Sequence, residues 1–173
     1  MLSPDWCLIP RPRRAAPFCL TLAGALAASS CLQPLLAQSP GPFAPFAGGF
    51  RGSGAVVGTD GHRERISCRS SGSVGERGES LSETMVCASD SYRFDIRTHA
   101  VAEGGAVRGQ WQETTRGVSG AFVGRVSGEQ FSGNVSGGGF TAQFSLRTGA
   151  HRQTFLLRPQ GGEVASVEVV LSR

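Results

Sequence analysis

The chain has 173 residues, 39% of them hydrophobic, and a formal net charge of +4 from 17 basic residues, all Arg, and 13 acidic ones. This length suits one domain with one core, and the regular placement of the apolar residues argues against a disordered chain. Residues 38–173 carry 14 Arg and 12 acidic residues without any basic run, a formal +2, which argues against nucleic-acid binding.

The first 37 residues have the layout of a secretory signal peptide. The basic segment Arg11–Arg14 precedes an apolar stretch rich in Ala and Leu, and we expect cleavage after Ala37, with Ala27 as a second candidate site. One alternative is lipoprotein processing at Cys31, which would add a lipid anchor. Another is an uncleaved membrane anchor, although polar residues interrupt the apolar stretch. Apart from these features, no membrane contact is predicted.

Residues 38–50 are rich in Pro and Gly and are predicted to form a linker or N-terminal arm. Pro fixes the backbone and lacks an N–H donor, so neither a helix nor a central strand is expected here. Phe43 and Phe46 lie within this segment. They are interpreted either as a docking element, for a partner or for one end of the following domain, or as incidental aromatics on a flexible tether.

The domain is expected to begin at residue 51. Residues 52–57 and 65–69 are predicted strands joined by a tight turn at Asp60-Gly61, and residues 70–80 are predicted to form a polar loop. Apolar residues then change phase within residues 88–91, which predicts a β-bulge or a sharp bend. The two phases consist of Leu81, Met85 and Cys87 before the change, and Tyr92, Phe94 and Ile96 after it.

Residues 105–147 show the clearest pattern, because apolar residues recur at every second position in short segments separated by Gly-rich turns. Residues 151–158 and 164–172 continue it, with Ala165, Val167, Val169 and Leu171 in phase. The pattern predicts an all-β, antiparallel, up-and-down meander of eight or nine strands over residues 51–173, closing into a barrel or flattened barrel. A β-sandwich is the alternative.

Cysteine usage predicts one disulfide. Three of the five Cys lie in the predicted leader, so export and cleavage would leave Cys68 and Cys87, an even number in an oxidising compartment. Both lie on apolar phases of consecutive strand segments. Free thiols or a metal site are the alternatives, but neither Cys belongs to a CxxC motif.

Several segments resemble a group of bacterial exported proteins of unassigned function. They are GSG at 52–54, GHRERISCR at 61–69, CASDSYRF at 87–94, GQWQE at 109–113 and FTA at 140–142. The resemblance spans residues 52–173, and Gly72 stands where those proteins often carry Tyr. It implies an exported protein with this order of strands and transfers no catalytic residue. The meander is also similar, in architecture alone, to the lipocalin-like barrels.

Motifs for catalysis or metal binding are weak. His62, His99 and His151 are far apart and form no metal-binding pattern. The alternative of a small hydrolase-like enzyme would use Ser or Asp within residues 88–91, or Glu64 and Glu113 as an acid/base pair. We assign no catalytic residue, metal or cofactor from the sequence and expect a non-enzymatic protein.

Two functional classes are compatible with these features, and both place the protein in the periplasm or outside the cell. In the first, a barrel binds a small apolar ligand, lined by Trp111, Phe122, Phe140 and Phe144, with room left by Gly109, Gly120, Gly124 and Gly133. In the second, an envelope protein binds a partner or has a structural role, the aromatics fill the core and the glycines allow close packing of the sheet.

Overall fold

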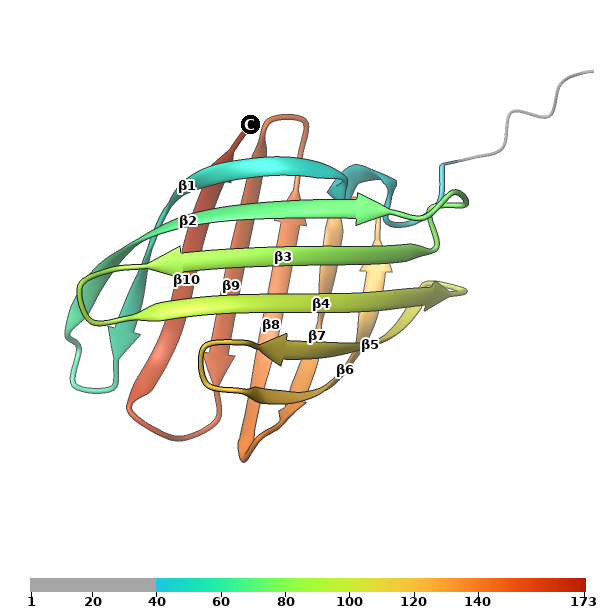
Figure 1. Ribbon diagram of the computed structural model, residues 1–173. Coiled ribbons are helices and arrows are strands. Elements are labelled where there is room, and N and C mark those ends of the chain that lie inside the picture. Colours follow the sequence, from blue (N-terminus) through green and yellow to red (C-terminus); the bar gives the residue numbers. More distant parts are fainter. Residues whose placement is uncertain (1–39) are drawn as a thin grey trace, which may run out of the picture. The chain divides into compact units, whose positions relative to one another are not determined.

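The computed structural model describes residues 40–173, which form a closed antiparallel barrel of ten strands and one short 3-10 helix (Figure 1). Each strand pairs with the next one in the chain, and β1 also pairs with β10. The elements are η1 (Ala44–Phe46), β1 (Gly48–Gly58), β2 (Arg63–Val74), β3 (Ser80–Ala88), β4 (Arg93–Glu103), β5 (Ala106–Glu113), β6 (Val118–Ser127), β7 (Gln130–Gly137), β8 (Phe140–Thr148), β9 (Arg152–Pro159) and β10 (Val164–Ser172). The predicted leader and its cleavage sites lie outside the described residues.

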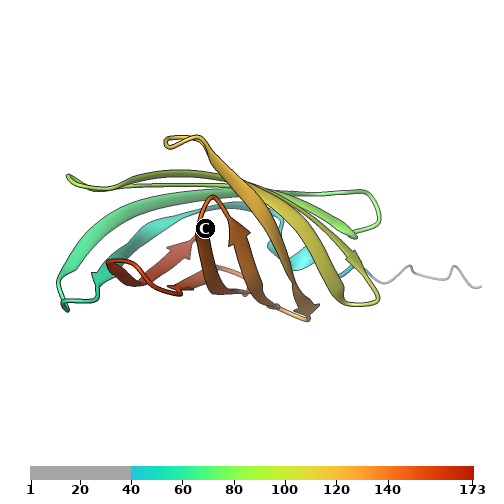
Figure 2. The ribbon, with the colours of Figure 1, turned by 90° about the horizontal axis from the view of Figure 1, so that it is seen from below.

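The barrel is flattened into two walls whose strands cross at a steep angle (Figures 1 and 2). Strands β2–β5 form one wall and β7–β10 the other, while β1 and β6 connect them. The all-β up-and-down barrel predicted from the alternation is therefore confirmed. Closure through the β1–β10 pair leaves no free sheet edge, which distinguishes the fold from the alternative sandwich.

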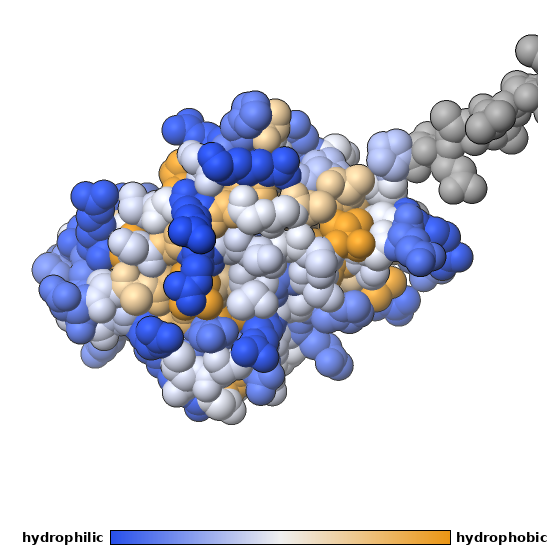
Figure 3. Space-filling view, turned by 45° about the horizontal axis from the view of Figure 1, so that its top comes forward, coloured by the Kyte–Doolittle hydropathy of each residue, from blue (hydrophilic) through white to orange (hydrophobic). Residues whose placement is uncertain are grey.

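Alternation along the strands separates an apolar interior from a polar exterior. Most of the face in Figure 3 is hydrophilic or of intermediate hydropathy, with smaller hydrophobic areas in between. Among the described residues the large apolar side chains that stay exposed are Val101, Val123 and Val170, on three different strands. The burial pattern thus agrees with the two-residue period of the sequence.

The phase change at residues 88–91 is a hairpin turn between two strands, so the predicted bulge or bend within one continuous strand is wrong. The N–H of Ser89 donates to Tyr92 O at 2.8 Å, and Cys87 lies directly opposite Phe94. This pairing moves the inward face from odd to even residue numbers, which explains the phase change. Because this hairpin divides one predicted segment into two strands, β3 and β4, the barrel has ten strands instead of eight or nine.

The segment predicted as a polar loop, residues 70–80, is a loop only at 75–79, because residues 70–74 and 80 are strand. Strand β2 continues to Val74, because its backbone groups pair with β1 and β3 whatever the polarity of the side chains. Ser70 is buried, and its hydroxyl donates to Gln153 Oε1 at 2.9 Å. Gly72 lies against the N-terminal segment, and a Cβ added to Gly72 would be only 2.5 Å from Phe46 O.

The N-terminal segment closes one end of the barrel and is not a flexible tether. Phe43 and Phe46 are completely buried and pack edge-to-face on Phe131, with ring centroids 5.6 and 6.3 Å apart. The N–H of Phe43 donates to Gly78 O at 2.9 Å. Pro45 is tolerated in the first turn of η1, where its missing N–H would have no partner. These residues belong to the barrel, and β1 begins at Gly48, so the predicted boundary at residue 51 is corrected.

Strand β10 contains an irregularity that the sequence pattern did not reveal. Its register with β1 shifts between Val57 and Gly58, so that Gly58 pairs with Val164. The shift turns Val164 inward and leaves Ala165 exposed, contrary to the predicted phase. Val167, Val169 and Leu171 keep the predicted inward phase.

The disulfide joins Cys68 and Cys87, which lie directly opposite each other on β2 and β3. Both side chains point inward and are buried among apolar neighbours that include Ile66 and Met85. The predicted pairing is therefore confirmed. It closes a chain segment with a sequence separation of 19 residues.

Replacing both Cys68 and Cys87 with Ser is expected to lower the free energy of unfolding by about 3 kcal/mol, since the unfolded chain gains freedom when the loop is no longer closed. Urea unfolding measures the loss, and circular dichroism should show unchanged strand content. The reduced wild-type protein is the control and should unfold at nearly the same urea concentration as the variant. Equal stability of the oxidised wild type and the variant would contradict the expectation.

Candidate functional site

The interior of the barrel contains two packed apolar clusters. One surrounds η1 and includes Phe43, Phe46, Phe122, Phe131 and Leu146. The other surrounds the disulfide and includes Phe50, Ile66, Met85, Val169 and Leu171. Side chains at the borders of both clusters remain partly accessible because they face a cavity.

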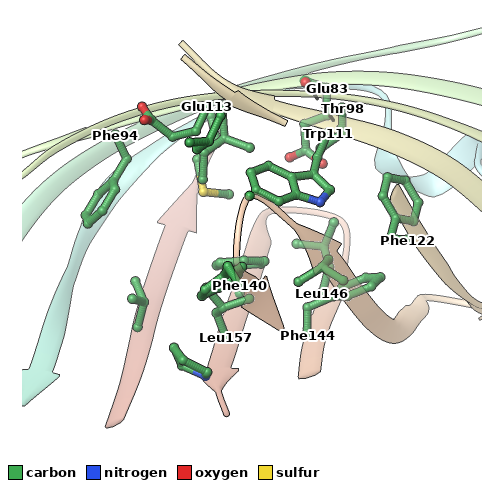
Figure 4. A pocket seen from close by; sticks show the side chains of 18 of the residues that line it. Glu83, Phe94, Thr98, Trp111, Glu113, Phe122, Phe140, Phe144, Leu146 and Leu157 are labelled. Atoms are coloured by element: carbon green, nitrogen blue, oxygen red, sulfur yellow. Dashed lines mark hydrogen bonds between the residues drawn. The ribbon is translucent and has the colours of Figure 1, made fainter. Parts of the chain in front are cut away.

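This cavity has a volume of about 480 Å³ and is lined by side chains from strands β3 to β10 (Figure 4). The volume lies within the range of roughly 300–1,000 Å³ that is typical of small-molecule sites. Its wall is mostly aliphatic and aromatic, and its charged residues are Glu83, Glu113 and Arg116. Arg116 and Gly138 belong to the turns after β5 and β7, so the cavity reaches the end of the barrel opposite η1.

All four aromatic residues selected from the sequence line this cavity. Trp111 and Phe140 pack edge-to-face with their ring centroids 6.1 Å apart, and the indole N–H donates to Ser136 O at 3.2 Å. Phe122 belongs to the packed cluster around η1 and Phe144 packs against that cluster, with their ring centroids 5.9 Å apart. Figure 4 shows Trp111 on one wall and Phe140 and Phe144 on the other. Whether they bind a ligand stays a prediction.

The four glycines proposed to leave room for a ligand have a different role. A Cβ at Gly120, Gly124 or Gly133 would lie 2.0 to 2.3 Å from a carbonyl oxygen of the adjacent strand. A Cβ at Gly109 would lie 2.2 Å from the ring of Phe122. Glycine at these positions therefore allows neighbouring strands, and the ring of Phe122, to approach the backbone closely. This is the role that the alternative interpretation of the sequence assigned to them.

Glu83 is the acidic side chain that the sequence analysis missed. It lies inward on β3 between Leu81 and Met85, and Thr98 faces it across the β3–β4 pair. Its Oε1 is buried without a hydrogen-bond partner. Burial raises the pKa of Glu83 to about 7, and the nearby Ser70 hydroxyl opposes the rise. Glu83 has the same odd parity as the apolar residues Leu81, Met85 and Cys87, and this alternation was the signal in the sequence that it points inward.

Glu113 has the opposite environment, although it also lines the cavity. Burial alone would raise its pKa, but hydrogen bonds from the Thr115 hydroxyl and from the backbone N–H groups of Asp95, Thr115 and Arg116 lower it to about 2. Arg116 Nη1 lies 3.4 Å from Glu113 Oε2. In Figure 4 its carboxylate points away from the centre of the cavity. Glu113 therefore holds the β5–β6 turn.

Glu64 also holds a turn, and it has no hydrogen-bond partner in common with Glu113. It accepts hydrogen bonds from the Ser89 hydroxyl and from the Ser91 N–H, and these bonds lower its pKa. The Ser89 hydroxyl oxygen also accepts the N–H of Tyr92 at 2.9 Å. The residues considered for an acid/base or nucleophile site thus stabilise two separate hairpins.

Among residues 40–173 no group of three or more His, Cys, Asp or Glu side chains is placed to hold a metal ion. His99 lies on the outer face, where its Nδ1 is 3.0 Å from the Ser82 hydroxyl. In the same part of the chain no helix is long and apolar enough to cross a membrane. The disulfide is of a kind that persists mainly outside the reducing cytoplasm.

Comparison of the chain with protein-family models and with curated proteins finds no match.

Proposed function

We propose that this protein is an exported, non-enzymatic binding protein that holds a small apolar ligand inside its barrel. The observation that carries the proposal is the cavity of about 480 Å³, which remains beside the two packed apolar clusters of the interior. Aromatic and aliphatic side chains make up most of the cavity wall, and such a lining favours apolar molecules. The cavity favours this function over an interaction protein with a filled core.

Export is supported by the signal-peptide layout of the first 37 residues and by the disulfide. The resemblance of residues 52–173 to exported bacterial β proteins points the same way. We therefore place the protein in the periplasm or outside the cell. Mass spectrometry of the protein purified from that compartment should detect a co-purifying lipid or another apolar molecule.

Diphenylhexatriene, a long hydrocarbon that fluoresces in apolar surroundings, is expected to bind the purified protein in the cavity. Leu157 lies on the cavity wall, so Leu157→Trp should fill part of the space and weaken binding by about tenfold or more. Trp111 gives a second signal, because it is the one Trp in residues 38–173 and lines the cavity. Its emission should change as the probe binds.

The matched control is Val170→Trp, which adds the same indole to the outer face of β10. It should leave binding of diphenylhexatriene unchanged. Loss of binding in both variants would indicate general disruption of the barrel, and unchanged binding in both would place the probe outside the cavity. Unchanged binding in both variants would contradict the proposed function.

A further inference from the structure

Glu83 lies at the inner end of the cavity, away from the turns. Along β3 the inward side chains are Leu81, Glu83, Met85 and Cys87, of which Leu81 packs in the cluster around η1 and Cys87 lies beside the β3–β4 turn. A ligand that enters past the turns would meet Glu83 last. Figure 4 shows Glu83 on the same wall as Thr98 and Trp111.

The carboxylate of Glu83 lacks the donors that normally accompany a buried acid. Oε1 has no partner and is buried, and the accessible part of the side chain belongs to the cavity wall. The hydroxyl of Ser70 is nearby, but its single hydrogen is directed to Gln153 Oε1 at 2.9 Å. A buried carboxylate oxygen left without a donor is unfavourable, because it has lost its hydrogen bonds to water and gained none in the protein. A donor on the ligand would remove that cost.

The charged groups of the cavity are unevenly distributed. Around Glu83, the facing positions on β2, β4 and β9 are the uncharged residues Ser70, Gly72, Thr98 and Gln153. The one cationic side chain on the described wall is Arg116, in the turn after β5. Its guanidinium is engaged by Glu113, by Arg93 O at 3.1 Å and by the ring of Phe94.

We propose that Glu83 is the head-group site of the cavity and that the ligand is an elongated apolar molecule ending in a hydrogen-bond donor, an amine or an alcohol. This inference rests on the proposed function and specifies its ligand. The donor binds the carboxylate of Glu83, which lines the cavity, and the hydrocarbon part contacts the aromatic wall. A carboxylic acid is disfavoured at this end, because two carboxylates would meet where no cation is present.

Three compounds with the same hydrocarbon chain test the proposal: decylamine, decanol and decanoate, each competing with diphenylhexatriene at about pH 8, where the amine is protonated. We expect decylamine to bind tightest and decanoate weakest. Glu83→Gln should weaken decylamine binding by about tenfold or more, since hydrogen bonds to a charged group are the strong ones. Decanoate should bind this variant at least as well as the wild type.

Glu83→Leu is a second variant that removes the acceptor altogether, and it should abolish the preference for amine over acid. Arg116→Gln is the control at the other end of the cavity, and it should preserve the order of the three compounds. Tightest binding of decanoate, lost in Arg116→Gln, would mean that the head group lies at the turns and would overturn the proposal. Equal competition by the three compounds would overturn it while leaving the apolar site intact. Absence of diphenylhexatriene binding would refute the proposed function itself, and this inference with it.

Discussion

Replacing Phe131 with Ala is expected to lower the free energy of unfolding by about 3 to 5 kcal/mol. Phe131 is 5% exposed and is the central ring of the aromatic cluster around η1. Its centroid lies 4.9 Å from Phe144 and 5.6 Å from Phe43, and Phe46 and Phe122 complete the contacts. Truncation would leave a cavity bordered by four rings, since the barrel backbone cannot collapse onto it. Urea unfolding followed by circular dichroism measures the effect.

Phe140→Ala is the matched control for this prediction. Both rings border the cavity, but Phe131 is 5% exposed whereas Phe140 is only half-buried. Phe140 is half-buried and packs against Trp111. Since part of its surface already faces open space, its loss should cost less than about 2 kcal/mol and should mainly weaken binding of diphenylhexatriene. Equal stability losses for the two variants would contradict the division of the interior into a packed cluster and a cavity.

Glu83 and Glu113 are expected to change stability with pH in opposite directions. The folded-state pKa of Glu113 is about 2, below its ordinary value of 4.5, so its ionised form stabilises the fold. This contribution is present above pH 4.5 and is lost as the pH falls toward 2. The folded-state pKa of Glu83 is about 7, so its protonated form is favoured in the fold. Its contribution is complete below pH 4.5 and is lost as the pH rises through 7.

The substitution Glu→Gln separates the two effects, each of which amounts to about 3 kcal/mol. Near pH 7.5, Glu113→Gln should destabilise the protein and Glu83→Gln should make it at least as stable as the wild type. The decrease in wild-type stability between about pH 4.5 and 7 should be absent from Glu83→Gln. Urea unfolding across about pH 2 to 8 provides the measurement. A parallel pH profile for the wild type and Glu83→Gln would show that Glu83 is not buried as described.

The sequence by itself determined the fold class and the disulfide. Alternation with a period of two residues depends only on which side of a strand each side chain takes, and that is a local property. It therefore identified the strands of residues 105–147 and the inward aromatics Trp111, Phe122, Phe140 and Phe144. The pairing of Cys68 with Cys87 followed because few Cys were left to pair.

Only the tertiary structure decided how the inward side chains share the interior. Phe43 and Phe46 lie in a segment without periodicity, and their burial depends on Phe131, a residue distant in sequence. In the sequence, Gly109 and Gly120 suggested empty space inside the barrel. In the structure, neighbouring atoms lie too close to them for a side chain to fit. Glu83 lacks the hydroxyl hydrogen of Ser70 because that hydrogen is donated to Gln153, and these two residues lie on β2 and β9, far apart in the sequence. Closure of the barrel brings these groups together, and alternation along single strands carries no information about contacts across the interior.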